Sequence, residues 1–146
     1  MSSRTVQRVL AEKGSHVATI EPEASVFEAL ERMAEHDIGA LVVTVDARLV
    51  GIVSERDYAR KVILAGRASR DTSVRDVMSG EVVTVSTKDT VGSCMQLMTA
   101  RRIRHLPVVE EGALLGIVSI GDLVKAIIAD QAFEIEQLQG YIAGTP

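Results

Sequence analysis

A serine that is followed three residues later by an aspartate occurs twice in this chain, in matching surroundings. The two segments are Gly51-Ile52-Val53-Ser54-Glu55-Arg56-Asp57 and Gly116-Ile117-Val118-Ser119-Ile120-Gly121-Asp122. Such a serine caps a helix N-terminus, and such an aspartate interacts favourably with the helix dipole. The same N-terminus binds anions through its free N–H groups, and the carboxylate can accept two hydrogen bonds from the hydroxyl groups of a ligand. The repeated pair therefore predicts a helix cap, a ligand site, or both.

A cationic cluster, Arg101-Arg102-Ile103-Arg104-His105, occurs in a chain whose formal net charge is −4. Arg101 and Arg102 fit the end of a helix, where cations interact favourably with the C-terminal dipole. Arginine also binds phosphate in a bidentate manner, so the rest of the cluster is a candidate for anion recognition. Arg56 and Arg60, on the helix predicted after the first Ser-x-x-Asp, either add charge to that site or are surface residues.

The remaining reactive side chains do not form a recognisable catalytic or metal site. Cys94 falls on the apolar stripe of a predicted helix and is expected in the core. His16, His36 and His105 lack the spacing of metal ligands. No Walker A, G-x-G-x-x-G or H-E-x-x-H segment occurs, and no activated base–nucleophile pair is visible. An enzyme that uses either repeated aspartate is therefore disfavoured, and we expect neither catalytic residues nor a metal.

Composition places the chain among globular proteins. Its 146 residues are 47% hydrophobic but only 3% aromatic, so aliphatic side chains must fill the core. The acidic balance argues against nucleic acid or an anionic membrane as a partner. The single cysteine excludes an intrachain disulfide and fits a reducing compartment. Without a signal-type apolar region or an apolar run of ~20 residues, we expect a soluble, cytoplasmic protein.

Hydrophobic periodicity predicts the same order of elements in two halves. In the first half, Ser25 and Glu28 form a capping-box pattern, and Asp46-Ala47-Arg48 is the turn of a hairpin. The elements expected in the first half are a helix at 4–12, a strand at 16–20, a helix at 25–36, strands at 40–45 and 49–54, and a helix at 55–64. Those expected in the second half are a leading helical segment at 74–78, a strand at 82–85, a helix at 90–100, strands at 106–110 and 114–119, and a helix at 120–129.

An internal duplication relates the halves. At an offset of 65 residues, 17–63 align on 82–128 without a gap, and three extra residues near Gly14-Ser15-His16 are the only length difference upstream. A half of this size buries little surface alone, so the two should pack on each other about a pseudo-two-fold axis. The predicted fold is α+β, with two β-α-β-β-α repeats and short mixed sheets. The predicted boundaries are repeat 1 at 5–64, a linker at 65–73, repeat 2 at 74–129 and a tail at 130–146.

The two Gly-Ile-Val-Ser-x-x-Asp segments, with His105-Leu106-Pro107-Val108-Val109 upstream of the second, resemble those of cystathionine-β-synthase (CBS) domains. The valine-containing strand and the Ser/Thr-Val helix start of each half are similar to that family too. The resemblance covers 5–129, and the tandem resembles a stand-alone Bateman module. It implies a non-enzymatic, regulatory function: binding of AMP, ADP, ATP, NAD(H) or a related adenosine compound between the halves, with no cofactor required.

The resemblance also implies two sites. In the family, the aspartate takes the ribose hydroxyls, the serine lies near the ribose or phosphate, and strand backbone lines the adenine slot. Each site joins the Ser-x-x-Asp of one half to the first strand and the pre-hairpin segment of the other. Carried over, the first site comprises Ile52, Ser54, Asp57, Val83, Ile103, Arg104 and His105, with Arg56 nearby. The second site comprises Ile117, Ser119, Asp122, Ala18, Ile38, Gly39 and Ala40.

The two sites are expected to differ in charge. Gly39, Ala40, Val42 and Gly121 stand where the other half has Arg104, His105, Pro107 and Arg56. The second site then lacks cations. We therefore expect the first site to hold phosphate better, and the second to be empty or to take the less charged part of a ligand.

The resemblance further implies a homodimer formed through helices of the paired halves, and an unknown protein partner in trans because no output domain is present. The tail is expected to cover a flank of this domain or of a second subunit. Two alternatives stay open: a ligand-independent interaction module, and binding of S-adenosylmethionine or a metal in the same cleft. The apolar tail residues are Ala132, Phe133, Ile135, Leu138, Tyr141 and Ile142.

Overall fold

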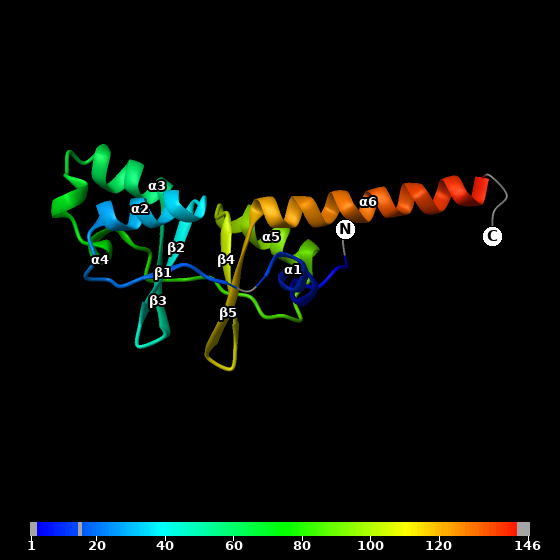
Figure 1. Cartoon of the computed structure of the whole chain (residues 1–146), viewed down its shortest axis with the longest axis horizontal. Helices are drawn as coiled ribbons and strands as arrows, with labels where there is room; N and C mark the ends of the chain where they lie inside the picture. Colours follow the sequence, from blue (N-terminus) through cyan, green and yellow to red (C-terminus); the bar gives the residue numbers. More distant parts are fainter. Residues whose placement is uncertain (1–2, 15, 143–146) are drawn as a thin grey trace.

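The computed structural model describes residues 3–14 and 16–142, with side chains as far as Gly140. Ser15 and the side chains of Tyr141 and Ile142, which the sequence analysis named, lie outside the described residues. The helices and short sheets confirm the α+β fold of two repeats (Figure 1). The elements in chain order are α1 (Val6–Lys13), β1 (Thr19–Ile20), α2 (Val26–His36), β2 (Ala40–Val45), β3 (Arg48–Ser54), α3 (Glu55–Tyr58), η1 (Ala59–Ile63), η2 (Ser69–Asp71), α4 (Val74–Val77), α5 (Val91–Arg101), β4 (His105–Glu110), β5 (Ala113–Ser119) and α6 (Ile120–Ile142).

The ends of α2 and α5 follow from their capping residues. Thr90 forms a capping box with Ser93 at the start of α5. Ser25 accepts the N–H of Glu28 at 3.1 Å, but the Glu28 carboxylate accepts from Arg32 at 3.2 Å. The α2 cap is therefore confirmed through its serine, while the glutamate is engaged along the helix. Both helices end on a residue in the left-handed region, which stops helix propagation at equivalent positions of the two repeats.

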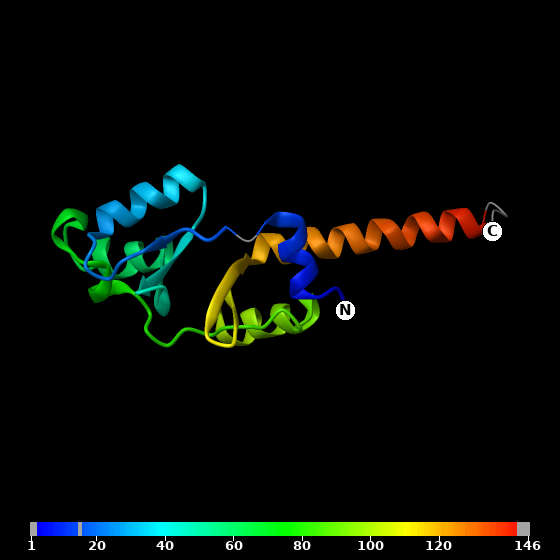
Figure 2. The ribbon, with the colours of Figure 1, turned by 60° about the horizontal axis from the view of Figure 1, so that its bottom comes forward.

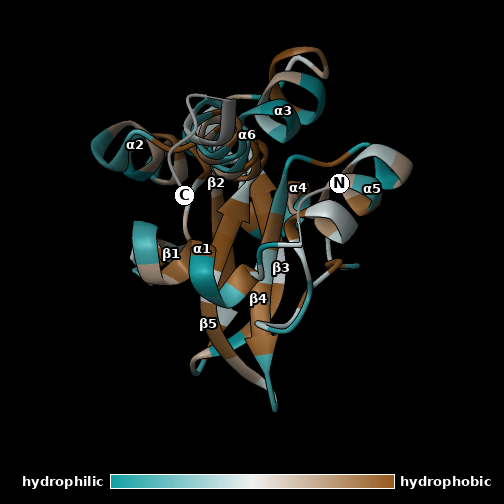
Figure 3. Ribbon diagram, turned by 90° about the vertical axis from the view of Figure 1, so that its right-hand side faces the viewer, coloured by the Kyte–Doolittle hydropathy of each residue, from teal (hydrophilic) through white to brown (hydrophobic). Residues whose placement is uncertain are grey.

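Each repeat is built on one hairpin. Strand β2 pairs antiparallel with β3, and β4 pairs antiparallel with β5. The registers are equivalent, since Val43 faces Gly51 in the first hairpin and Val108 faces Gly116 in the second. In the first half β1 adds to β2 in parallel, so that sheet is mixed, as predicted. Figure 3 shows the apolar strands in the middle of the molecule, with helices around them.

The strand predicted at 82–85 is wrong, because only an isolated bridge from Val85 to Val108 forms there. In the first half, Val42 donates its N–H to the Ala18 carbonyl at 3.4 Å. The aligned residue of the second half is Pro107, which has no N–H and leaves that parallel bond unmade. Val85 still donates to the Pro107 carbonyl at 3.0 Å, so the segment lies beside β4 without forming a strand.

The helix predicted at 55–64 is present in two parts, a short α3 and the π-helical η1. Leu64 donates its N–H to the Ala59 carbonyl at 3.1 Å, which is the i to i−5 bond of a π-helix. Periodicity alone does not distinguish this wider turn from an α-helix. Val62 is fully buried, so the segment still covers the first core.

The leading helices are exchanged between the repeats. Val6, Val9 and Leu10 of α1 pack into the core of the second half, with side chains of α5, the second hairpin and α6. Val74 and Val77 of α4 pack into the core of the first half, with α2 and the first hairpin. Each repeat therefore has its core completed by the leading helix that precedes the other repeat in the sequence. Figure 2 shows α1 lying against the second half, next to the start of α6.

Four backbone hydrogen bonds fix this exchange, each 2.8 Å long. The segment before α1 is joined to the start of α5, because Val6 donates its N–H to the carbonyl of Asp89 and Val91 donates its N–H to the carbonyl of Arg4. The segment before α4 is joined to the start of α2 in the equivalent way. There Val26 donates to the carbonyl of Thr72, and Val74 donates to Ala24.

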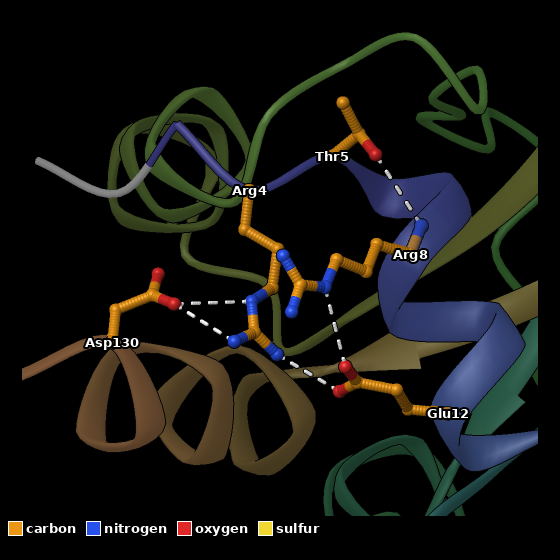
Figure 4. Close-up of polar contacts among 5 residues, drawn as sticks. All are labelled: Arg4, Thr5, Arg8, Glu12 and Asp130. Atoms are coloured by element: carbon orange, nitrogen blue, oxygen red, sulfur yellow. Dashed lines mark hydrogen bonds and ion pairs between the residues drawn. The ribbon is translucent and has the colours of Figure 1, made fainter. Parts of the chain in front are cut away.

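Arg4 adds a polar contact to the same arrangement (Figure 4). Its guanidinium donates to Asp130 of α6 at 2.8 and 3.2 Å and to Glu12 of α1 at 2.8 Å. The Arg4 side chain is 9% exposed, whereas those of Asp130 and Glu12 are 30% and 54% exposed, so the arginine is buried and its partners are not. It holds the N-terminal segment against both helices that flank the second core.

The expected tail is the second part of one 23-residue helix, α6. Residues 131–139 are exposed, so the described tail does not cover a flank of its own domain. Figures 1 and 2 show α6 extending away from both repeats. Contact with a second subunit stays a prediction. No helix in the described part of the chain is long and apolar enough to cross a lipid bilayer.

The glycine that opens each repeated motif is required by the exchanged segment. A Cβ at Gly51 would lie 2.6 Å from Met78 Sδ and 3.0 Å from the carbonyl oxygen of Ser79. A Cβ at Gly116 would meet only the Leu10 side chain, at 2.8 Å. The flexible end of Leu10 can move, whereas the Ser79 backbone is bonded to Ile52 in both directions, at 3.0 and 2.9 Å.

Gly51→Ala is expected to lower the free energy of unfolding by about 1–3 kcal/mol, the usual cost of overpacking. Gly116→Ala is expected to cost less, and Gly80→Ala is the control because a Cβ there meets nothing within 4 Å. Urea unfolding followed by circular dichroism measures all three variants. Equal losses for Gly51→Ala and Gly80→Ala would show that the α4 segment does not lie tightly against the motif.

Candidate functional site

The first Ser-x-x-Asp is a complete capping box. Ser54 Oγ accepts the N–H of Asp57 at 3.2 Å, and Asp57 Oδ2 accepts the N–H and the hydroxyl of Ser54 at 2.9 and 3.1 Å. Lys61 Nζ lies 3.4 Å from Asp57 Oδ1. The predicted helix cap is therefore confirmed. Because a carboxylate has about four acceptor positions, Asp57 can keep this cap and still accept a ligand hydroxyl.

The second Ser-x-x-Asp forms the same cap, with an added cation. Asp122 Oδ2 accepts the N–H of Ser119 at 2.8 Å, and Ser119 Oγ accepts the N–H of Asp122 at 3.2 Å. Lys13, the last residue of α1, donates to the same Asp122 oxygen at 2.6 Å and to the Ile117 carbonyl at 2.8 Å. Burial alone would raise the pKa of Asp122, but the bonds from Lys13 and Ser119 outweigh it and hold the pKa below its ordinary 3.8.

The expectation that the second site lacks cations is therefore wrong. Lys13 is far from Asp122 in the sequence and was assigned to the first repeat. The exchange of α1 brings it to the second half, where it occupies two acceptors expected to serve a ligand. Neither residue type nor spacing signals this contact, because it depends on which half α1 packs against.

The pre-hairpin segments meet the motifs in the same way in both repeats. Glu55 donates its N–H to the Gly39 carbonyl at 3.0 Å, and Ile120 donates its N–H to the Arg104 carbonyl at 2.9 Å. Each carbonyl accepts one of the free N–H groups at a helix start. This bond fixes the position of residues 39 and 104 relative to the helix that follows each motif.

His105 lies where the two halves meet. A Cβ at Gly39 would lie 3.7 Å from His105 Nε2 and 3.1 Å from Glu55 Oε1, so these three residues from different halves are neighbours. Burial lowers the pKa of His105 below its ordinary 6.5; Asp122 opposes this shift, and Lys13 and Arg104 add to it. His105 is therefore neutral near pH 7 and is surrounded by charged groups of both signs.

An arginine-rich pocket of about 240 Å³ lies between the halves. Arg56 comes from α3 of the first half, and Arg102 and Arg104 come from the segment between α5 and β4 of the second. Arg56 Nη1 donates to the Arg102 carbonyl at 3.1 Å, which ties the halves together at this point. No acidic side chain is among its described lining residues, which are Arg56, Met98, Thr99, Arg102, Ile103, Arg104 and Ile120.

This pocket gathers part of the predicted first site. Arg56, Ile103 and Arg104 were predicted, whereas Arg102 was interpreted as a helix-end cation. Arg102 does end α5, with a left-handed backbone (φ 55°), and that conformation is part of the turn that lines the pocket. The sequence carries no signal for this second role, since it requires the contact with Arg56.

The other predicted residues lie mainly in their own half. Ala40 pairs with Ser54 across the first hairpin, and His105 pairs with Ser119 across the second. Val83 packs against the second core, and Ala18 packs against the first. Ile52 is bonded through its backbone to the segment after α4, and Ile38 is 36% exposed. Their contact with a ligand stays a prediction.

Cys94 belongs to the core, as predicted. It is fully buried in the second half, and burial, with a contribution from Asp89, raises the pKa of its thiol to about 11. In the described part of the chain, no group of three or more His, Cys, Asp or Glu side chains is placed to hold a metal ion.

Comparison with known proteins gives a consistent result. The family model for the CBS domain matches residues 13–63 and 74–129. The mitochondrial CBS domain-containing protein CBSX3 of Arabidopsis thaliana is 39% identical over 97% of this chain and 73% of its own length. A putative signal-transduction protein with CBS domains from Burkholderia ambifaria is 45% identical, with a TM-score of 0.84 over 87% of this chain and 96% of its own.

A more distant solved structure is also similar to this chain. The hexameric CBS-CP12 protein from bloom-forming cyanobacteria is 29% identical, with a TM-score of 0.75 over 85% of this chain and 71% of that one.

The position of His105 predicts that acid lowers stability. As the pH falls below 6.5, the unfolded chain binds a proton at His105 that the folded chain does not, so the free energy of unfolding decreases. The lowered pKa of Asp122 acts in a second window, where stability is lost as the pH falls below 3.8 and through the folded-state pKa.

Chemical denaturation between pH 8 and 5 tests the first window, because this range brackets the unfolded-state histidine pKa of about 6.5. We expect His105→Gln to flatten the decline in stability, and the matched change His36→Gln at an exposed position to leave it as in wild type. An unchanged decline in His105→Gln would contradict the assignment.

Proposed function

The chain belongs to the CBS domain family, and on that premise we propose that it is a regulatory module that binds an adenine nucleotide between its two repeats. The candidate ligands are AMP, ADP, ATP and NAD(H). The module acts by changing conformation rather than by catalysing a reaction. Its ligand is a signal and not a cofactor, and its output requires a protein partner in trans.

The observation that carries this proposal is the arginine-rich pocket between the halves. Three arginines, Arg56, Arg102 and Arg104, line one small space, and a guanidinium is suited to bidentate contact with phosphate. The volume of about 240 Å³ suits the phosphate end of a nucleotide better than the whole molecule. Since Arg56 precedes Asp57 directly, a phosphate there leaves the ribose near the first Ser-x-x-Asp.

The two sites are proposed to differ in what they bind. Asp57 is capped by Ser54 and has Lys61 at 3.4 Å, so its carboxylate retains acceptor positions for a ribose diol. Asp122 is paired with Lys13 at 2.6 Å, and a ligand there must displace or share that cation. The first site is therefore the stronger nucleotide site in this proposal.

Ligand binding would bias the geometry between the repeats. A nucleotide that contacts Arg56 from one half and Arg104 from the other is bound best when the two lie close together. A ligand shifts a conformational equilibrium by its difference in affinity for the two states. We propose that this closure is read by a second copy of the chain through helices of the paired repeats, and by a partner protein.

A ligand-independent interaction module is the second candidate. It is favoured by the caps, because both repeated aspartates accept hydrogen bonds within their own motif and the fold uses them without any ligand. In that case the motifs would be structural, and added nucleotide would leave the protein unchanged.

Isothermal titration calorimetry with AMP, ATP, NAD⁺ and adenosine tests the proposal. We expect AMP to bind more tightly than adenosine, and Asp57→Ala to weaken AMP binding by about tenfold or more, which corresponds to ~1.4 kcal/mol. Asp122→Ala is expected to have a smaller effect. Arg104→Gln is expected to reduce the preference for AMP over adenosine, with Arg101→Gln, outside the pocket lining, as its control.

Two outcomes would contradict parts of the proposal. Equal losses for Asp57→Ala and Asp122→Ala would remove the difference between the sites. Absence of binding by every compound tested, with the protein folded, would remove nucleotide binding and favour the interaction module.

A further inference from the structure

The projecting part of α6 carries an apolar stripe that its own chain leaves exposed. Val124 is 40% exposed, Ile128 58%, Ile135 56% and Leu138 60%. The first part of the helix packs on the second core through Leu123 and neighbouring side chains. Val124 and Ile128 belong to the first part of α6, and Ile135 and Leu138 belong to the part that extends away from both repeats (Figures 1 and 2).

The stripe follows a heptad. Five residues form the stripe, and successive members are four, three, four and three residues apart: Val124, Ile128, Gln131, Ile135 and Leu138. This spacing is that of a coiled-coil seam, with Ile128 and Ile135 at position a and the others at position d. Ile128 and Ile135 at a, with Leu138 at d, match the pattern that favours two parallel strands, whereas Val124 and Gln131 at the other d positions depart from it. Gln131 is the only polar residue of the seam, and its amide both donates and accepts, so it favours a register in which it meets another amide.

The charges of α6 are compatible with a second copy of the same helix. Next to the seam, Glu134 occupies position g and faces Gln139 at position e of a parallel copy, so no like charges oppose each other there. Asp130 and Glu136 lie away from the seam, and Asp130 is engaged by Arg4. Residues 126–142 contain no Lys or Arg, so this part of α6 has no cation to attract an anionic lipid surface.

The length of the projecting segment also calls for a partner. The part of α6 beyond residue 130 has 12 helical residues, from Gln131 to Ile142. Most helical stability in proteins comes from the packing of an amphipathic face, and residues 131–139 are all exposed in this structure. A second helix packed along the stripe would supply the missing contacts.

We propose that α6 forms a parallel, two-stranded seam with α6 of a second copy of this chain, along Val124, Ile128, Gln131, Ile135 and Leu138. This contact begins at the end of repeat 2 and continues beyond it, and it does not depend on nucleotide binding. It places the repeats of the two copies at the same end of the seam, related by a two-fold axis that runs along it.

Sedimentation velocity over about a hundredfold range of protein concentration tests the seam, since self-association follows mass action. The double variant Ile135→Glu/Leu138→Glu is expected to halve the mass of the largest species formed by the wild type. Phe133→Glu is the matched control, because Phe133 is 62% exposed but is turned by ~200° from Ile135 around the helix. It is expected to keep the wild-type mass.

The orientation is tested by Leu138→Cys under oxidising conditions. In a parallel seam the two introduced thiols face each other and form a covalent dimer, whereas wild type, whose Cys94 is buried, forms none. Circular dichroism checks that the variants fold. We expect them to do so, because all changed positions lie in the exposed part of α6 and the repeats are unaltered.

Three results would overturn the proposal. One is a wild-type protein that stays monomeric at every concentration, which would leave a helix of another protein as the occupant. Another is a folded double variant with the mass of wild type, which would place the dimer contact elsewhere. The third is a Leu138→Cys variant that dimerises without cross-linking, which would exclude the parallel arrangement.

Discussion

The exchange of leading helices is the constraint on which the rest of this structure depends. Val6 and Val91 donate backbone hydrogen bonds that attach the segment before α1 to the second half, and Val26 and Val74 make the equivalent bonds in the first. A repeat of this size buries little surface with its own strands and helices. Each core is instead completed by apolar side chains from the leading helix of the other repeat. The two repeats therefore have to fold as one unit.

The candidate site follows from that constraint. Because α1 crosses to the second half, Lys13 reaches Asp122, and the second motif becomes an ion pair as well as a cap. Because the halves are held side by side, Arg56 and Arg104 line one pocket and His105 lies next to Gly39. The duplicated motifs are similar in local geometry, while the cations around them differ. That difference is the physical basis for two sites of unequal affinity.

Much of this structure could be predicted from the sequence, because local rules set it. The caps at Ser25, Ser54 and Ser119, the two hairpins and the burial of Cys94 follow from residue type and periodicity. The failures involve partners that are distant in sequence. The strand at 82–85 is lost because Pro107 has no N–H to donate. This is evident only once β4, which contains Pro107, is known to lie beside that segment. The Lys13 contact likewise requires the path of α1.

Residue-resolved amide hydrogen exchange on the intact protein tests the central claim most directly. If the exchanged helices join the two cores, the slowest amides of β2 and of β4 should exchange with the same free energy of opening, equal to that of global unfolding. Gly51→Ala should lower both by the same amount, although Gly51 lies in the first half. Protection that persists in one hairpin while the other exchanges would show two independent repeats and would contradict the account.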